Sequence, residues 1–259
     1  MRHFLLLAHP RSGSTLLLRS LADHPNVKMF GELFNDEEDE RQRAFAGRRR
    51  SGADLQAGSD ASDYYKEGED GAEFLRQRVL RNSSPDPNIK AIGFKLFYCQ
   101  ARENPYVKTV WEYLLTNPNI YVIHLQRRNL LESYFSLRVA TITREWARPK
   151  GATPSDFTLE PFRLDPEQCA RKFNAITAHR EWVKTSWSRR PMLEITYEDD
   201  LRGKYEQTIR AIEDFLDLEH VPTEQRLEKQ ARRPPREAIL NYAELKEYFR
   251  YTLHEEYFE

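Results

Sequence analysis

The residues best suited to chemistry near the N-terminus lie in one short turn, PRSGST, at positions 10–15. Gly13 permits a positive φ, so consecutive backbone N–H groups can converge on a single anion. Arg11 adds a permanent charge on a planar fork suited to phosphate. A helix that begins near Ser14 would aim its positive end at the same point. The turn predicts a phosphate site made of Arg11, Ser12, Gly13, Ser14 and Thr15. The alternative is an ordinary helix cap on one of the serines.

A second group of candidate anion ligands follows an apolar run, in QRRNLLESYFSL at positions 126–137. Arg127 and Arg128 stand where the run ends, and Asn129 can cap the helix that follows. Ser136 lies eight residues after Arg128, just over two helical turns along. A phosphate held between an arginine and this hydroxyl fits that spacing. The alternative is a surface arginine pair and a serine bonded to its own helix backbone.

The two motifs also indicate what the ligand is not. A nucleotide-hydrolysing P-loop ends in Gly-Lys-Ser/Thr and uses an acid at a neighbouring strand end to hold Mg²⁺. This turn lacks that ending, and the strand end carries Arg127 and Arg128 where the acid would stand. Two guanidinium groups repel a metal cation and attract a further phosphate. The sequence predicts a metal-free site for a ligand with two separated anionic groups.

Strands alternating with helices must position these groups. Apolar runs predict strands at Phe4–Ala8, Ile89–Phe97, Ile120–Leu125 and Met192–Thr196, with a further short one at Val27–Phe30. Helical patterns lie at Leu16–Leu21, Ala72–Leu80, Tyr106–Leu115, Leu130–Thr143, Pro166–Trp187, Thr208–Leu216 and Pro235–Phe249. This alternation predicts an α/β fold, a mostly parallel central sheet with helices on both faces.

The composition is typical of a globular domain with a substantial core. Of 259 residues, 39% are hydrophobic and 31% are charged, with a formal net charge of −1. That balance argues against a broad surface for nucleic acid or anionic membranes. No apolar run approaches the roughly 18 residues of a membrane span. Cys99 and Cys169 predict small buried side chains rather than a disulfide or metal site. We expect a single domain, residues 1–259, in a reducing, cytoplasmic setting.

Residues 36–71 interrupt the pattern. The segment carries charges of both signs, several glycines and serines, and few large apolar residues. It is either a solvated surface insertion or a lid over the substrate, because long loops in compact domains often have a function.

Together the motifs resemble those of sulfotransferases that use 3′-phosphoadenosine-5′-phosphosulfate (PAPS). PRSGSTLL resembles the 5′-phosphosulfate loop of that superfamily in its bacterial, carbohydrate-acting form, and RNLLESYFS resembles its 3′-phosphate motif. The likeness extends to MFGELFN, IGFKLF, ITYEDDL and the tail KQARRPPREAILNYAELKEYF. It implies a P-loop-type three-layer sandwich and relatives that act on trehalose, Nod-factor or lipopolysaccharide-type sugars.

The resemblance implies which residues bind the donor. It places the 5′-phosphosulfate on residues 11–15 and the 3′-phosphate on a strand-end arginine and Ser136. Arg127 and Arg128 both remain candidates for that arginine, since the match depends on a one-residue register. A C-terminal segment that often closes over the nucleotide in the family corresponds here to Gln230, Arg232 and Arg233. The alternative for that segment is a solvated loop.

Sulfuryl transfer needs an aligned acceptor, a stabilised leaving phosphate and a base for the acceptor proton. Relatives that act on phenols and steroids place a histidine base in Lys-x-His, whereas KLF here keeps Lys95 and has Phe97 in that place. The resemblance therefore implies a carboxylate base, Glu32 in FGELFND, with Asp36 in reserve. Arg11 would stabilise the leaving phosphate, and Lys95 would bridge to it or to the transferring group. The alternatives are a surface ion pair for Glu32 and a lysine reaching water for Lys95.

These observations predict an enzyme that moves a sulfuryl group from PAPS to a hydroxyl on a carbohydrate or glycolipid. Its other product is 3′,5′-adenosine bisphosphate (PAP), and no metal takes part. Two alternatives stay open: a Mg-ATP-dependent small-molecule kinase on the same fold, and an inactive nucleotide-binding module. We expect no nucleic-acid partner, and a homodimer is left open. The identity of the acceptor does not follow from the sequence.

Overall fold

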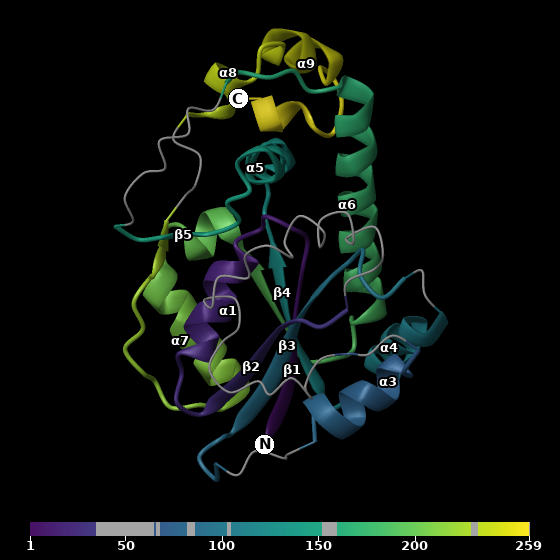
Figure 1. Ribbon diagram of the computed structural model, residues 1–259, viewed down its shortest axis with the longest axis vertical. Coiled ribbons are helices and arrows are strands. Elements are labelled where there is room, and N and C mark those ends of the chain that lie inside the picture. Colours follow the sequence, from purple (N-terminus) through teal and green to yellow (C-terminus); the bar gives the residue numbers. More distant parts are fainter. Residues whose placement is uncertain are drawn as a thin grey trace.

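A five-stranded parallel sheet forms the centre of the protein. The computed structural model describes residues 1–34, 65, 68–81, 86–102, 105–151, 160–228 and 233–258. Within them the sheet has the order β2-β3-β1-β4-β6 (Figure 1). Its strands are β1 (Arg2–Ala8), β2 (Val27–Glu32), β3 (Ala91–Phe97), β4 (Ile120–Gln126) and β6 (Met192–Thr196). The predicted α/β class and the five predicted strands are confirmed.

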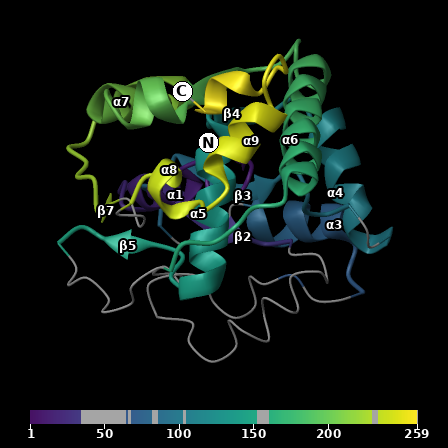
Figure 2. The ribbon, with the colours of Figure 1, turned by 90° about the horizontal axis from the view of Figure 1, so that it is seen from above.

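Helices cover both faces of the sheet, as Figure 2 shows. One face carries α1 (Ser14–Ala22) and α7 (Tyr205–Leu216). The other face carries α3 (Gly71–Phe74, continued by a π-helical turn, Leu75–Val79), α4 (Pro105–Thr116) and α6 (Pro166–Ser186). A small separate sheet pairs β5 (Arg148–Pro149) with β7 (Leu227–Glu228), and no sequence pattern predicted it.

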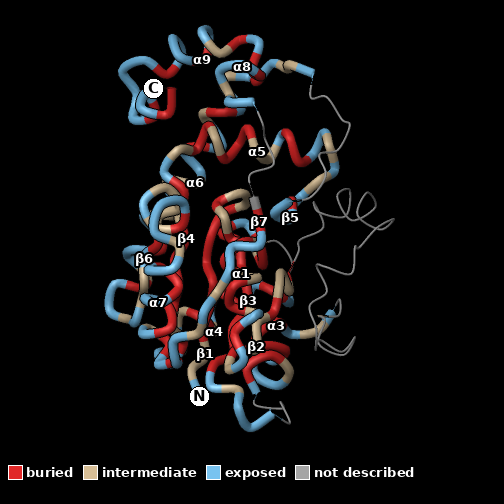
Figure 3. Tube along the Cα trace, turned by 90° about the vertical axis from the view of Figure 1, so that its left-hand side faces the viewer, coloured by how far each residue is buried: buried red, intermediate tan, exposed pale blue. Residues whose placement is uncertain are grey.

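The central strand β1 explains why both faces are covered. Leu5 and Leu7 belong to the core under α3, α4 and α6, whereas Phe4, Leu6 and Ala8 belong to the core under α1 and α7. All five side chains are fully buried, and Figure 3 shows the sheet as the buried interior. Burial of each large apolar side chain stabilises the fold by about 1.5–3 kcal/mol. An uninterrupted apolar run is thus what a strand buried on two faces requires.

A helical cap lies over the carboxyl ends of the strands. It consists of α5 (Leu130–Thr143), α8 (Pro235–Ala238), α9 (Tyr242–Tyr248) and a final 3₁₀ turn (Glu255–Phe258), and it shares a core with the start of α6 (Figure 1). These elements enclose the edge of the sheet at which the predicted anion motifs lie.

The prediction of one helix over Pro235–Phe249 is wrong, because the helix ends at Ala238 and a second one begins at Tyr242. Ile239 is extended and bridges to Phe162. The side chain of Asn241 accepts from the Leu164 N–H at 3.0 Å and donates to the Leu164 carbonyl at 2.8 Å. Backbone bonds to Phe162 use groups that a continuous helix would have used: the Phe162 N–H donates to the Ala238 carbonyl, and the Leu240 N–H donates to the Phe162 carbonyl, both at 3.0 Å.

Three further expectations concern the two cysteines, the charged segment and membrane-spanning helices. Cys169 is buried as predicted, but Cys99 is exposed in the turn after β3, so that prediction is wrong. The charged segment 36–71 falls almost entirely outside the described residues. Among the described helices, none is long and apolar enough to cross a membrane.

Candidate active site

The turn after β1 has the conformation of an anion cradle. Gly13 has φ +96° and precedes the first turn of α1, with no side-chain cap. Its carbonyl accepts from the N–H groups of Leu16 and Leu17 at 3.0 and 3.2 Å. The ordinary cap on a serine, which was the alternative, is therefore not what the structure contains. The helix begins at Ser14, where the sequence placed it.

Two features of this turn point to a ligand. Ser12 is fully buried, and its Oγ has no hydrogen-bond partner among the described residues. A buried hydroxyl without a hydrogen-bond partner costs folding free energy, which a bound ligand that accepts from it would recover. A Cβ on Gly13 would approach Tyr197 Cδ2 to 2.7 Å, so only glycine fits against that ring.

Arg11 joins the two predicted anion motifs. Its Nε donates to Ser136 Oγ on α5 at 3.1 Å, and its Nη1 donates to the Trp146 carbonyl at 2.6 Å. Burial, with the neighbouring positive charge of Arg127, lowers the pKa of Arg11 to about 10. Its backbone φ is +67°, a conformation that costs a non-glycine residue free energy. A strained, desolvated cation of this kind is typical of a functional site.

Arg127 builds the site from within. The residue is 7% exposed, its Nη1 donates to the Arg11 carbonyl at 3.0 Å, and its Nη2 pairs with Glu132 at 2.5 Å. The guanidinium carbon lies 4.7 Å from the centre of the Tyr197 ring. These contacts hold the Arg11 backbone in its unusual conformation.

Arg128 differs from its neighbour in exposure. Its side chain is 52% exposed and forms an ion pair with Asp199 on the short turn after β6. Its backbone N–H, like that of Asn129, donates to the Glu198 carboxylate. Asn129 caps α5 as predicted, accepting from the Glu132 N–H at 2.8 Å. An exposed guanidinium beside a helix N-terminus is accessible to an anionic ligand.

His9 fixes the cradle to α5. Ser133 Oγ donates to the Pro10 carbonyl at 3.1 Å, so the His9 Nε2–H donates to Ser133 Oγ, also at 3.1 Å. Burial, followed by the charges of Arg180 and Arg127, lowers the pKa of His9 far below its usual value. The ring is neutral and packs in the interior.

A second histidine supports the end of β4. Tyr98 and His124 are buried, and the Tyr98 hydroxyl lies 2.6 Å from His124 Nε2. Arg180, from α6, bonds to Tyr98 and donates to the Arg127 carbonyl at 2.5 Å. Burial and the charges of Arg180 and Lys184 lower the pKa of His124 to about 3. His124 is a fully buried residue of β4.

The candidate base and its lysine lie at the ends of β2 and β3. A bulge between Phe30 and Glu32 brings Glu32 into register with Lys95. Glu32 Oε1 lies 2.8 Å from Lys95 Nζ, and Glu32 Oε2 accepts from Gln100 Nε2 at 3.0 Å. Lys95 is 4% exposed, so the alternative in which it reaches bulk water is wrong. The ion pair is part of the edge that also holds the cradle.

Comparison with known proteins shows the family of this chain. Residues 4–222 match the model of the sulfotransferase family. The chain belongs to the sulfotransferase family. It is 26% identical to nodulation protein H of Rhizobium meliloti strain 1021 over 262 residues, which cover 99% of this chain and 94% of the relative. Nodulation protein H of Rhizobium tropici is 24% identical over 258 residues, covering 99% and 92%. The crystal structure of a sulfotransferase from Alicyclobacillus acidocaldarius aligns with a TM-score of 0.48 and 14% identity, covering 96% and 91%.

Most of the residues predicted for this sulfotransferase's site lie at one edge of its sheet. Asp36, Gln230 and Arg232 lie outside the described residues, and Arg233 is exposed directly before α8. Gln100, Tyr197 and Arg180 were missed by sequence reasoning. The signal that could have found Gln100 and Tyr197 is their place within three residues of the ends of parallel strands, where side chains of different strands meet.

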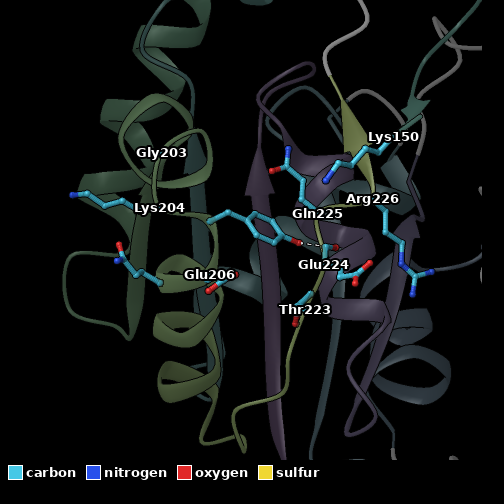
Figure 4. Close-up of a pocket in the computed structure, with 10 residues that line it drawn as sticks. Lys150, Gly203, Lys204, Glu206, Thr223, Glu224, Gln225 and Arg226 are labelled. Carbon is cyan, nitrogen blue, oxygen red and sulfur yellow. Dashed lines mark hydrogen bonds between the residues drawn. The ribbon is translucent and has the colours of Figure 1, made fainter. Parts of the chain in front are cut away.

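The sulfotransferase also has a polar cavity of about 900 Å³ beside α1, between the start of α7 and the chain that leads to β7 (Figure 4). The Tyr205 hydroxyl in its wall lies 2.5 Å from Ser20 Oγ on α1 and donates to the Glu224 carbonyl at 3.4 Å. Both cations and carboxylates line the cavity: Lys150, Lys204, Arg226, Glu206 and Glu224. In the part of the chain that is described, no group of three His, Cys, Asp or Glu side chains could hold a metal ion.

Proposed function

We propose that this sulfotransferase moves the sulfuryl group of PAPS to a hydroxyl of a carbohydrate acceptor, with Glu32 as the base. The observation that carries the donor assignment is the 3.1 Å bond from Arg11 to Ser136. This bond joins the proposed cradle for one phosphate to Ser136, a proposed ligand of the second phosphate. PAPS carries two such groups, a 5′-phosphosulfate and a 3′-phosphate.

The residues of the cradle fit a phosphate. Ser12 Oγ offers a buried donor without a partner among the described residues, and the positive φ of Gly13 lets consecutive N–H groups of the loop converge. The first turn of α1 adds the positive end of its dipole. Arg11 supplies a charge that survives its burial, since its pKa of about 10 leaves it protonated at neutral pH.

The second phosphate is assigned to Arg128 and Ser136. Arg127 is buried and committed to Arg11 and Glu132, whereas Arg128 presents a half-exposed guanidinium. An incoming phosphate would exchange with Asp199 for that guanidinium and accept from the hydroxyl of Ser136. Arg127 then acts on the ligand through the backbone of Arg11.

Within this assignment the chain's groups have distinct tasks. PAPS supplies the activated sulfuryl group. Glu32 takes the proton from the acceptor hydroxyl as the new O–S bond forms, and the electron pair of the breaking S–O bond passes to the 5′-phosphate. Arg11 and the loop N–H groups stabilise the charge on that phosphate. Lys95 offsets the charge of Glu32, so that the carboxylate repels the anionic donor less.

The carbohydrate acceptor rests on likeness rather than on a pocket. Phe97 stands in place of the histidine base of the phenol- and steroid-acting relatives, and the loop PRSGSTLL resembles the carbohydrate-acting form. The nodulation proteins match along almost the whole chain. The kinase alternative has no support, because the family model matched by residues 4–222 is that of sulfotransferases.

The experiment is transfer of ³⁵S from labelled PAPS to a panel of oligosaccharides, glycolipids and small hydroxyl compounds, with Glu32→Gln beside wild type. We expect a sulfated sugar and PAP in equal amounts. Glu32→Gln should lose turnover and keep PAP binding. Transfer to phenols alone would overturn the acceptor class, and wild-type turnover by Glu32→Gln would remove Glu32 as the base. PAP binding without turnover on any acceptor would favour the inactive module.

A further inference from the structure

Gln100 lies beneath the candidate base and is held at both ends of its amide. It is 3% exposed, in the turn that follows β3. Its Oε1 accepts from the Phe97 N–H at 2.8 Å, and its Nε2 donates to Glu32 at 3.0 Å. An N–H group cannot accept, so the Phe97 bond fixes which end of the amide is oxygen. Gln100 therefore presents a donor, and not an acceptor, to the carboxylate.

The backbone of Gln100 is as firmly placed as its side chain. Its N–H donates to the Phe97 carbonyl at 3.0 Å, and its own carbonyl accepts from the Trp111 indole N–H at 2.9 Å. Trp111 is a buried residue of α4 within the hydrophobic core. The amide is thus anchored in the rigid part of the fold, which is what precise placement of a reactive group requires.

The carboxylate of Glu32 has one donor on each oxygen. Lys95 Nζ lies 2.8 Å from Oε1, and Gln100 contacts Oε2. Among the described residues Lys95 is the charged group that pairs with this carboxylate. The side chain of Glu32 is 30% exposed and that of Lys95 is 6% exposed. The two donors hold the carboxylate from the end of β3 and the turn after it, and part of the Glu32 side chain stays exposed.

This arrangement restricts where a proton can go. Both donors favour the charged carboxylate, and neither can accept a proton from it. A proton from an acceptor hydroxyl must therefore enter a lone pair that Lys95 and Gln100 leave open. The direction of proton transfer is set by the pair of donors rather than by Glu32 alone.

We propose that Gln100 is a positioning residue for the base, fixing the orientation of the Glu32 carboxylate. The role of Gln100 rests on the proposed function, in which Glu32 accepts the proton. Gln100 acts through Glu32 and touches neither substrate.

Gln100→Glu tests this with little change of shape. The new carboxylate can still accept from the Phe97 N–H, but it replaces the donor to Glu32 by a repelling oxygen. Gln100→Met removes both bonds at similar volume. Gln77→Glu is the matched control, because Gln77 Nε2 donates to Glu73 at 2.9 Å on the exposed surface of α3 and its π-helical turn.

The measurements are PAP affinity and the pH profile of kcat/KM. In Gln100→Met we expect the acid limb to move up by about one pH unit, since a hydrogen bond that favours the charged form is lost. In Gln100→Glu it should move further, with kcat reduced roughly tenfold or more. PAP affinity should stay within about twofold, and Gln77→Glu should match wild type.

Two outcomes overturn the role of Gln100, and they differ from failure of the base assignment. The first outcome is an acid limb of the kcat/KM profile at the wild-type pH in both Gln100 variants. Gln100 would then only stabilise the turn after β3. The second outcome is a double-mutant result. If Gln100→Glu lowers the rate of the Glu32→Gln variant by the same factor as it lowers the rate of wild type, its effect does not pass through Glu32. If Glu32→Gln itself turns over normally, the base assignment fails first.

Discussion

The buried His124 makes the stability of this protein strongly dependent on pH. Its ring is fully buried, and burial with the charges of Arg180 and Lys184 lowers its pKa from 6.5 to about 3. The native state keeps the ring neutral, whereas the unfolded chain binds a proton below pH 6.5. Stability is therefore complete above pH 6.5 and falls as the pH drops toward 3.

The size of the effect follows from that interval. At 1.36 kcal/mol per pH unit, a pKa lowered from 6.5 to about 3 amounts to roughly 5 kcal/mol of unfolding free energy. That is a large part of the 5–15 kcal/mol typical of a domain. The lowered pKa of His9 acts in the same direction. Acid should therefore destabilise the strands that carry the candidate site.

Urea unfolding followed by tryptophan fluorescence between pH 8 and pH 4.5 measures this. His124→Gln keeps an oxygen that can accept from the Tyr98 hydroxyl but cannot bind a proton. Below pH 6.5 its unfolding free energy should fall about 1.4 kcal/mol per pH unit less steeply than that of wild type. Above pH 7.5 the two curves should run parallel. Equal slopes below pH 6.5 would refute the reasoning.

Three further results are expected. Gly13→Ala should weaken PAP binding at least tenfold, because its Cβ would meet Tyr197 at 2.7 Å in a backbone with φ +96°; calorimetry measures this, and unchanged affinity would contradict it. Arg128→Gln should weaken PAP binding about 10–100-fold with little effect on the melting temperature. Arg127→Gln should instead lower the free energy of unfolding by about 1–3 kcal/mol. The reverse pattern would exchange the roles of the two arginines. Activity should survive EDTA, since two arginines occupy the strand end that would carry a metal-binding acid; a loss that Mg²⁺ restores would be decisive against this.

The sheet could be predicted because its physical cause is local. A strand buried on two faces must be apolar at nearly every position, and β1, β3 and β4 are. The start of α5 matches its prediction because Asn129, a residue type that caps helices, directly precedes it. The break before α9 could not be predicted, because it depends on Asn241 bonding to Leu164, which is distant in the chain.

The site was predictable in its parts but not in its connections. The loop and the strand-end arginines each carry recognisable residue types, yet nothing in their spacing shows that Arg11 contacts Ser136. Arg127 and Arg128 are alike in sequence, and only their burial separates them. Gln100 has no reactive group of its own, so its role becomes visible only when β2 and β3 place it under Glu32.

The central claim is a site for one nucleotide with two separated phosphates. Its most direct test is calorimetric titration of the metal-free protein with PAP, with 5′-AMP, which lacks the 3′-phosphate, and with ATP. We predict that PAP binds at least tenfold more tightly than 5′-AMP and ATP, and that Arg128→Gln removes most of the difference from 5′-AMP. Equal affinity for PAP and 5′-AMP, or tighter binding of ATP, would contradict it.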